Sequence, residues 1–105
     1  MLNQLVLVGR LTENPQLEKA DDKNYCTITL AVNRSFKNAD GIYETDIIPI
    51  ILWQGIAENT AEYCKKGDII GVKGRIQTVE DKIQIIAEKI TFLSSKKEDK
   101  KDEEN

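Results

Sequence analysis

The chain has 105 residues, no histidine, and a formal net charge of −3 from 15 basic and 18 acidic side chains. This length predicts one domain, and the missing histidine excludes Cys/His zinc sites and His-dependent catalytic triads. Nucleic-acid-binding domains often have a basic excess, so any such function here depends on where the cations lie rather than on their sum.

The N-terminal half of the chain predicts three strands. Residues 5–8 (LVLV) are aliphatic and indicate the first strand, whereas the polar stretch 12–24, with a proline and paired aspartates, is typical of a loop. Residues 25–36 alternate apolar and polar side chains, as a half-buried strand does. The glycine-containing stretch 37–41 predicts a turn that leads into a third strand at 42–53.

The C-terminal half predicts one helix and two further strands. In residues 56–67, apolar side chains recur every three or four residues, which favours a one-faced helix. Residues 68–79 and 82–93 have the composition of strands, and the acidic pair 80–81 between them predicts a tight turn. Residues 94–105 contain no apolar side chain, so we expect a disordered charged tail.

The predicted order of three strands, a short helix and two strands indicates an all-β domain over residues 1–93. Several short strands with glycines at bends favour a small closed barrel. The expected fold is a five-stranded OB-fold barrel with one short helix between strands 3 and 4, whose second and third strands form the usual ligand face.

Catalysis and metal binding are not expected from the residue types present. Cys26 and Cys64 lie 38 residues apart without a CxxC pattern, and the carboxylate pairs at 21–22 and 80–81 fall in predicted turns. The N-terminal apolar stretch is too short for a signal peptide, and no apolar run is long enough to span a membrane. We therefore expect a cytoplasmic protein that is not an enzyme, has no cofactor and keeps its thiols reduced.

A surface for single-stranded nucleic acid needs aromatic faces on which bases stack, interleaved with cations that contact phosphates. The predicted stacking residues stand around one hairpin and are Phe36, Tyr43 and Trp53. For Trp53 the alternative is an ordinary core position, because tryptophan is usually well buried. The cations predicted to accompany these aromatics are Arg34, Lys37, Lys73 and Arg75, the last two on one side of their strand by parity.

Five blocks of the sequence together resemble the bacterial single-stranded DNA-binding protein family. In chain order they are LVLVGRLTENPQL, TLAVNRSFKN, DIIPIILWQGIAEN, YCKKGDIIGVKGRIQT and AEKITFL, and they cover essentially residues 1–93. The resemblance implies an OB-fold that assembles as a homotetramer and binds single-stranded DNA with little sequence preference. It also implies a role in protecting exposed strands in replication, recombination or repair.

The resemblance assigns positions to individual residues. Phe36 and Trp53 fall at two of the family's base-stacking positions, and the residues in its basic binding region are Lys66, Lys73 and Arg75. We include Arg10, in the first block, among the predicted DNA contacts.

The sequence also departs from the family pattern. Family members commonly have an aromatic where Ile47 stands, a long loop with another aromatic where this chain has only VEDK, and often Arg at the position of Glu18. Because each stacked base contributes about 1–3 kcal/mol, these losses are expected to weaken binding. The family's acidic C-terminal tip is missing from KKEDKKDEEN, so we do not expect recruitment of replication partners through it.

Alternatives stay open at this point for the function and for the assembly, and an RNA-binding or unassigned OB-fold module is one of them. The short loop, the missing tip and the negative net charge also fit an OB-fold protein–protein adaptor of the primosomal replication-restart type, with weak DNA binding. The first strand would be an exposed edge unless it is paired, which fits a dimer as well as the tetramer that the resemblance implies.

Overall fold

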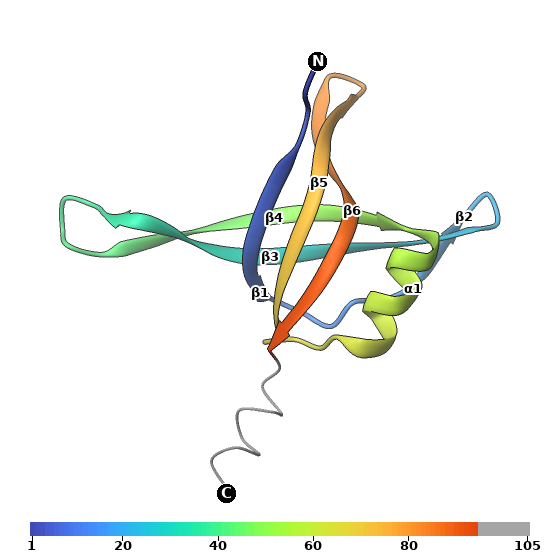
Figure 1. Ribbon diagram of the computed structural model, residues 1–105, viewed down its shortest axis with the longest axis horizontal. Coiled ribbons are helices and arrows are strands. Elements are labelled where there is room, and N and C mark those ends of the chain that lie inside the picture. Colours follow the sequence, from blue (N-terminus) through green and yellow to red (C-terminus); the bar gives the residue numbers. More distant parts are fainter. Residues whose placement is uncertain (95–105) are drawn as a thin grey trace, which may run out of the picture.

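The computed structural model describes residues 1–94, which form six strands and one short helix (Figure 1). Their bounds are β1 Leu5–Leu11, β2 Glu18–Ala20, β3 Lys23–Lys37, β4 Tyr43–Trp53, α1 Gln54–Tyr63, β5 Ile69–Val79 and β6 Lys82–Ser94. The five predicted strands and the helix are confirmed. The predicted charged tail lies outside the described residues, apart from Ser94, with which β6 ends.

The predicted loop at 12–24 contains a short strand, β2, and this is the first difference from the expected order. β2 pairs antiparallel with the start of β3 through a turn at Asp21 and Asp22. Both residues have left-handed backbone (φ 51° and 64°), as a two-residue type I′ hairpin turn requires. The helix therefore follows the third long strand as predicted, but lies between β4 and β5 once β2 is counted.

α1 ends earlier than the helix predicted for 56–67. Its last helical residue is Tyr63, and Cys64 already has extended backbone (φ −115°, ψ 151°). Lys65 and Lys66 therefore lie after the helix rather than in its last turn, and Gly67 takes a positive φ of 96° there. No helix within residues 1–94 has the length and apolar character needed to cross a membrane.

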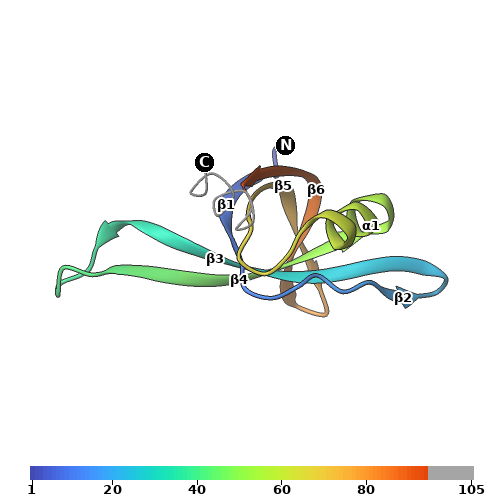
Figure 2. The same cartoon turned by 90° about the horizontal axis from the view of Figure 1, so that it is seen from below.

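The strands close into a ring. The sheet order is β1-β5-β6-β4-β3-β2, and β1 pairs a second time with β3 at Arg10 and Leu11. β4 and β6 are parallel neighbours that meet at Ile51 and Ile86. Figures 1 and 2 show the result: β1, β5 and β6 cross one side of the long β3–β4 hairpin, with α1 near one end and the hairpin turn projecting at the other.

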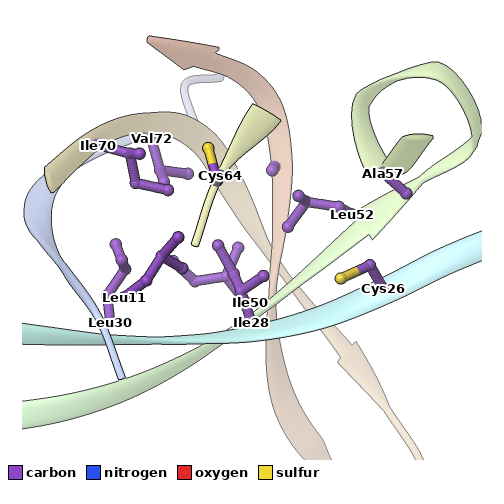
Figure 3. Close-up of a cluster of buried hydrophobic side chains, with 11 residues drawn as sticks. Leu11, Cys26, Ile28, Leu30, Ile50, Leu52, Ala57, Cys64, Ile70 and Val72 are labelled. Carbon is purple, nitrogen blue, oxygen red and sulfur yellow. The ribbon is translucent and has the colours of Figure 1, made fainter. Parts of the chain in front are cut away.

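The core lies between this hairpin and the crossing strands (Figure 3). Even-numbered side chains of β3 and β4 point into it, and the buried ones are Cys26, Ile28, Leu30, Ile50 and Leu52. Ile70 and Val72 of β5 face them, and Ala57 of α1 covers the end next to Leu52. Since side chains alternate along a strand, the odd-numbered residues of the hairpin must point away from the core.

Candidate nucleic-acid interface

The odd-numbered residues of β3 and β4 form a continuous surface on the side of the hairpin away from the core. Directly opposite residues of an antiparallel ladder share a face, and the register runs from Tyr25 opposite Trp53 to Asn33 opposite Thr45. We call this surface the outward face; its residues are Tyr25, Thr27, Thr29, Ala31, Asn33, Thr45, Ile47, Pro49, Ile51 and Trp53. None of these residues is charged. The acidic side chains that give the chain its negative net charge therefore lie outside this set.

Trp53 lies on the outward face rather than in the core. It is the last residue of β4, 38% of its surface is exposed, and it is absent from the buried cluster. Its ring centroid is 5.3 Å from that of Tyr25, with the two planes inclined by 39°. Such tilted contacts between aromatic rings are favourable, so the two rings form one partly exposed aromatic surface, which we call the platform.

Tyr25 is the residue of the platform that the sequence-based site did not include. The alternation of residues 25–36 places it on the polar face of its strand, which is where it lies. The missing information was the register between β3 and β4, because only the register brings Tyr25 directly opposite Trp53. The signal in the sequence that could have pointed to Tyr25 is the odd parity that it shares with Trp53.

The other predicted aromatics lie at the far end of the hairpin. Phe36 is 62% exposed and Tyr43 is 54% exposed, and both stand next to the turn at 38–42. Lys37 lies opposite Tyr43, with its Nζ 5.6 Å from the centre of the Tyr43 ring, within the range of a cation–π contact. At about 3.3 Å per residue along β3, Phe36 lies about 35 Å from the platform, so the aromatics mark two ends of one strip rather than one cluster.

Arg34 is not brought to the outward face. The register places Asp46 opposite Val32, on the other face of the hairpin, and the Arg34 guanidinium is bound there. Its Nε and Nη2 donate to the Asp46 carboxylate at 3.1 and 3.0 Å, and its Nη1 donates to Glu44 at 3.1 Å. These contacts raise the pKa of Arg34 and lower the pKa of Asp46. A DNA contact by Arg34 stays a prediction, made from its closeness to Phe36 in the sequence.

Two predicted cations border the outward face. Arg10 pairs with Ala31 and lines a groove of about 430 Å³ together with Asn33 and Thr45. Lys66 lines a second groove, of about 370 Å³, together with Thr27 and Thr29 of β3. The backbone N–H of Lys66 donates to the Asn14 side chain at 2.7 Å, which ties this segment to the loop before β2. Glu13 and Glu18 line this second groove as well.

Lys73 and Arg75 belong to a different part of the ring. Lys73 lies opposite Val6 of β1 and Lys89 of β6, in the layer that crosses the other side of the hairpin (Figure 2). Arg75 donates to the Gln77 side chain at 2.9 Å and forms an ion pair with Glu88 at 3.6 Å. Within residues 1–94, neither side chain has a contact that brings it together with Trp53, so their roles as DNA contacts stay predictions.

Within the described residues there is neither a cluster of metal ligands nor an ionised thiol. Residues 1–94 contain no group of three His, Cys, Asp or Glu side chains that could hold a metal ion. Cys26 and Cys64 are buried and not disulfide-bonded, and burial raises the pKa of both thiols, that of Cys64 to about 11. Both therefore stay protonated at neutral pH and lack the thiolate that a nucleophile needs.

Comparisons with a family model and with individual known proteins point to the same family. Residues 2–93 match the model of the Single-strand binding protein family. Single-stranded DNA-binding protein B of Bacillus subtilis (strain 168) is 54% identical over 79 residues, which are 74% of this chain and 70% of that protein. Single-stranded DNA-binding protein 1 of Clostridium acetobutylicum is 44% identical over 78 residues, 72% of this chain and 71% of that protein.

A third relative is longer. Single-stranded DNA-binding protein 1 of Lactococcus lactis subsp. lactis (strain IL1403) is 51% identical over 79 residues, which are 74% of this chain but 53% of that protein. The aligned part of this chain thus spans about half the length of that relative.

Proposed function

Because the chain belongs to the Single-strand binding protein family, we propose that it binds single-stranded DNA along the outward face of the β3–β4 hairpin. The observation that carries this proposal is the platform, where Tyr25 and Trp53 present partly exposed rings side by side. Base stacking on aromatic side chains is the sequence-tolerant way to hold a single strand, because every base has a π-face.

The rest of the outward face fits an extended strand with its phosphates toward the borders. Its side chains are uncharged, and the cations at its borders include Arg10, Lys37 and Lys66. OB-folds bind about 4–16 nucleotides in such grooves. In this proposal the chain covers DNA and carries out no reaction on it, as protection of exposed strands in replication, recombination or repair requires. This function places it in the cytoplasm, where bacteria keep their DNA.

A competition experiment tests the proposal. A fluorescently labelled thymine oligomer is titrated with the chain, its anisotropy is followed, and unlabelled single-stranded or duplex DNA of equal length is added. We expect the single strand to displace the label far better than the duplex, since duplex bases are stacked on each other and cannot reach Trp53. We also expect affinity to fall as salt is added, because binding releases the counterions that surround the phosphates, and added salt opposes this release. Equal competition by duplex DNA would contradict the proposal.

We further propose that copies of the chain associate through the outer side of β1, as a tetramer or as a dimer. Val6 and Val8 alternate along this strand and are 66% and 52% exposed, and Leu93 of β6 is 51% exposed. Removing such apolar surface from water contributes about 25 cal/mol per Å². Sedimentation of the chain and of Val8→Glu tests this: the wild type should sediment as an oligomer and the variant as a smaller species.

A further inference from the structure

A carboxylate stands directly beside the platform. Glu18 of β2 lies opposite Tyr25 of β3, and Tyr25 lies opposite Trp53 of β4. Residues paired in this way share a face, and neighbouring strands are about 4.7–4.9 Å apart. Glu18, Tyr25 and Trp53 therefore form a row across three strands, with the two rings at one end and an acidic side chain at the other.

The Glu18 carboxylate has unused hydrogen-bonding capacity. Within residues 1–94 its side chain forms no hydrogen bond and no ion pair, whereas Glu44, Asp46 and Glu88 are all paired with arginines. Burial is the main cause that raises the pKa of the neighbouring Cys26 thiol, and the negative charge of Glu18 adds to it. An ionised carboxylate is an acceptor only, and this exposed one is free to accept a hydrogen bond from a bound molecule.

Space for a nucleotide exists on both sides of this row. Glu18 lines the groove of about 370 Å³ that also holds Lys66. Trp53 lines a separate hollow of about 290 Å³ together with Lys23 of β3. A base lying on the platform would have its edge toward Glu18, with Lys66 in one space and Lys23 in the other. Glu13 and Asp21 line these two spaces as well.

The chemistry of the bases decides what Glu18 can accept. Cytosine and adenine carry exocyclic amino groups, which donate, whereas thymine presents an O4 acceptor at the corresponding position. Glutamate accepting from the cytosine amino group is an established pairing. A carboxylate facing thymine O4 would place two acceptors together. Stacking alone does not distinguish these bases, because it uses only their faces.

We propose that Glu18 is a base-selecting residue, which accepts a hydrogen bond from the amino group of a base stacked on Tyr25 and Trp53 and so favours cytosine and adenine over thymine. This inference rests on the proposed single-stranded DNA binding. It differs from a simple repulsive role, in which the negative charge of Glu18 weakens the binding of every sequence by the same factor.

The test compares cytosine and thymine oligomers of equal length, which have the same number of phosphates. Anisotropy titrations give the two dissociation constants for the wild type, Glu18→Gln, Glu18→Ala and Asp40→Asn. Asp40 lies in the turn at the far end of the same hairpin, so Asp40→Asn removes one carboxylate away from the platform. Glu18 is exposed on a three-residue strand, and unchanged thermal unfolding of its two variants shows that they remain folded.

We expect the preference for cytosine over thymine, expressed as the ratio of the two dissociation constants, to fall roughly fivefold in Glu18→Ala, which loses one polar contact to a base. The ratio should also fall in Glu18→Gln, because the amide still accepts from cytosine but can now donate to thymine O4 as well. Asp40→Asn should leave this ratio unchanged. The proposal is overturned if both affinities rise by the same factor in the Glu18 variants, because Glu18 would then act only by charge, and DNA binding itself would stand. If the wild type binds neither oligomer, this proposal and the proposed function both fail.

Discussion

The two ends of the outward face carry aromatic side chains in different settings. At the platform end, Tyr25 and Trp53 contact each other, and their sequence neighbours Cys26 and Leu52 are completely buried in the core. At the turn end, Phe36 and Tyr43 stand on the part of the hairpin that projects beyond the ring (Figure 1). No residue between 33 and 47 belongs to the core or packs against it.

The turn end is held by polar contacts instead. Arg34 bridges Glu44 and Asp46, and Thr45 donates to the Asn33 side chain at 2.8 Å. Exposed ion pairs contribute little to stability, and segments with few buried contacts open at low free-energy cost. A ring whose sequence neighbours are fixed in the core would need little ordering before it binds a base. We therefore expect the platform end to contribute most of the affinity and the turn end to extend the site.

The largest expected effect concerns the support of the platform. Leu52→Ala removes a fully buried side chain next to Trp53, and such changes lower the free energy of unfolding by about 2–5 kcal/mol. At the turn end, Ile42→Ala removes a side chain that is 59% exposed. This variant should change the free energy of unfolding by no more than about 0.5 kcal/mol. Urea unfolding of both variants measures this, and equal losses would show that the two ends are equally supported.

The next effect concerns affinity. Trp53→Ala should weaken binding of a thymine oligomer by about 1–3 kcal/mol, because it removes a stacking surface. Phe36→Ala should cost less, about 1 kcal/mol, since the ring lies on the less supported end. Anisotropy titrations give both values, and Trp53→Phe, which keeps an aromatic face, should retain part of the affinity. A larger loss of affinity in Phe36→Ala than in Trp53→Ala would show that the turn end, and not the platform end, contributes most of the affinity.

A smaller effect concerns salt. If Lys37 neutralises one phosphate near the turn, Lys37→Gln should make the slope of log affinity against log salt less steep by about 0.7. Lys89→Gln, in the layer on the other side of the hairpin, should leave the slope unchanged. Titrations at several salt concentrations measure both slopes. Identical slopes for wild type and Lys37→Gln would show that Lys37 neutralises no phosphate.

The smallest effect concerns pH and the ion cluster at the turn end. Arg34 holds the pKa of Asp46 below its ordinary value of 3.8, so ionised Asp46 stabilises the folded state above that pH. This contribution is lost as the pH falls through the lowered pKa. Asp46→Asn should therefore be slightly less stable than wild type near neutral pH and equally stable in strong acid. Asp40→Asn, which breaks no ion pair, should match wild type in thermal unfolding at both pH values.

Much of the fold and part of the site follow from local sequence. Alternation in residues 25–36 predicts the first hairpin strand, and the turn predicted at 37–41 leads to the second at 42–53. The register decides between the two positions considered for Trp53 and places it on the outward face. The tight turn predicted at 80–81 is present because both residues adopt left-handed backbone, with φ of 52° and 65°.

The remainder depends on contacts between distant residues. The pairing of Tyr25 with Trp53 follows from a register that no local pattern reports, and so does the position of Glu18 beside them. The shift in register between Asn33 and Lys37 breaks the alternation near Phe36. Arg34 looked like a companion of Phe36 because the two are close in sequence, but alternation directs its guanidinium to carboxylates on the other face.

The fluorescence of Trp53 can show whether a single strand stacks on the platform. Trp53 is the only tryptophan of the chain, so its fluorescence reports on this position alone. The wild type is titrated with a labelled thymine oligomer at low and moderate salt, and the tryptophan emission and the label anisotropy are followed together. We expect the emission to be quenched and to reach its plateau at the oligomer concentration at which the anisotropy change is complete. Both changes should need more DNA at the higher salt concentration. A rise in anisotropy with unchanged Trp53 emission would show that DNA binds elsewhere and that no base stacks on the platform.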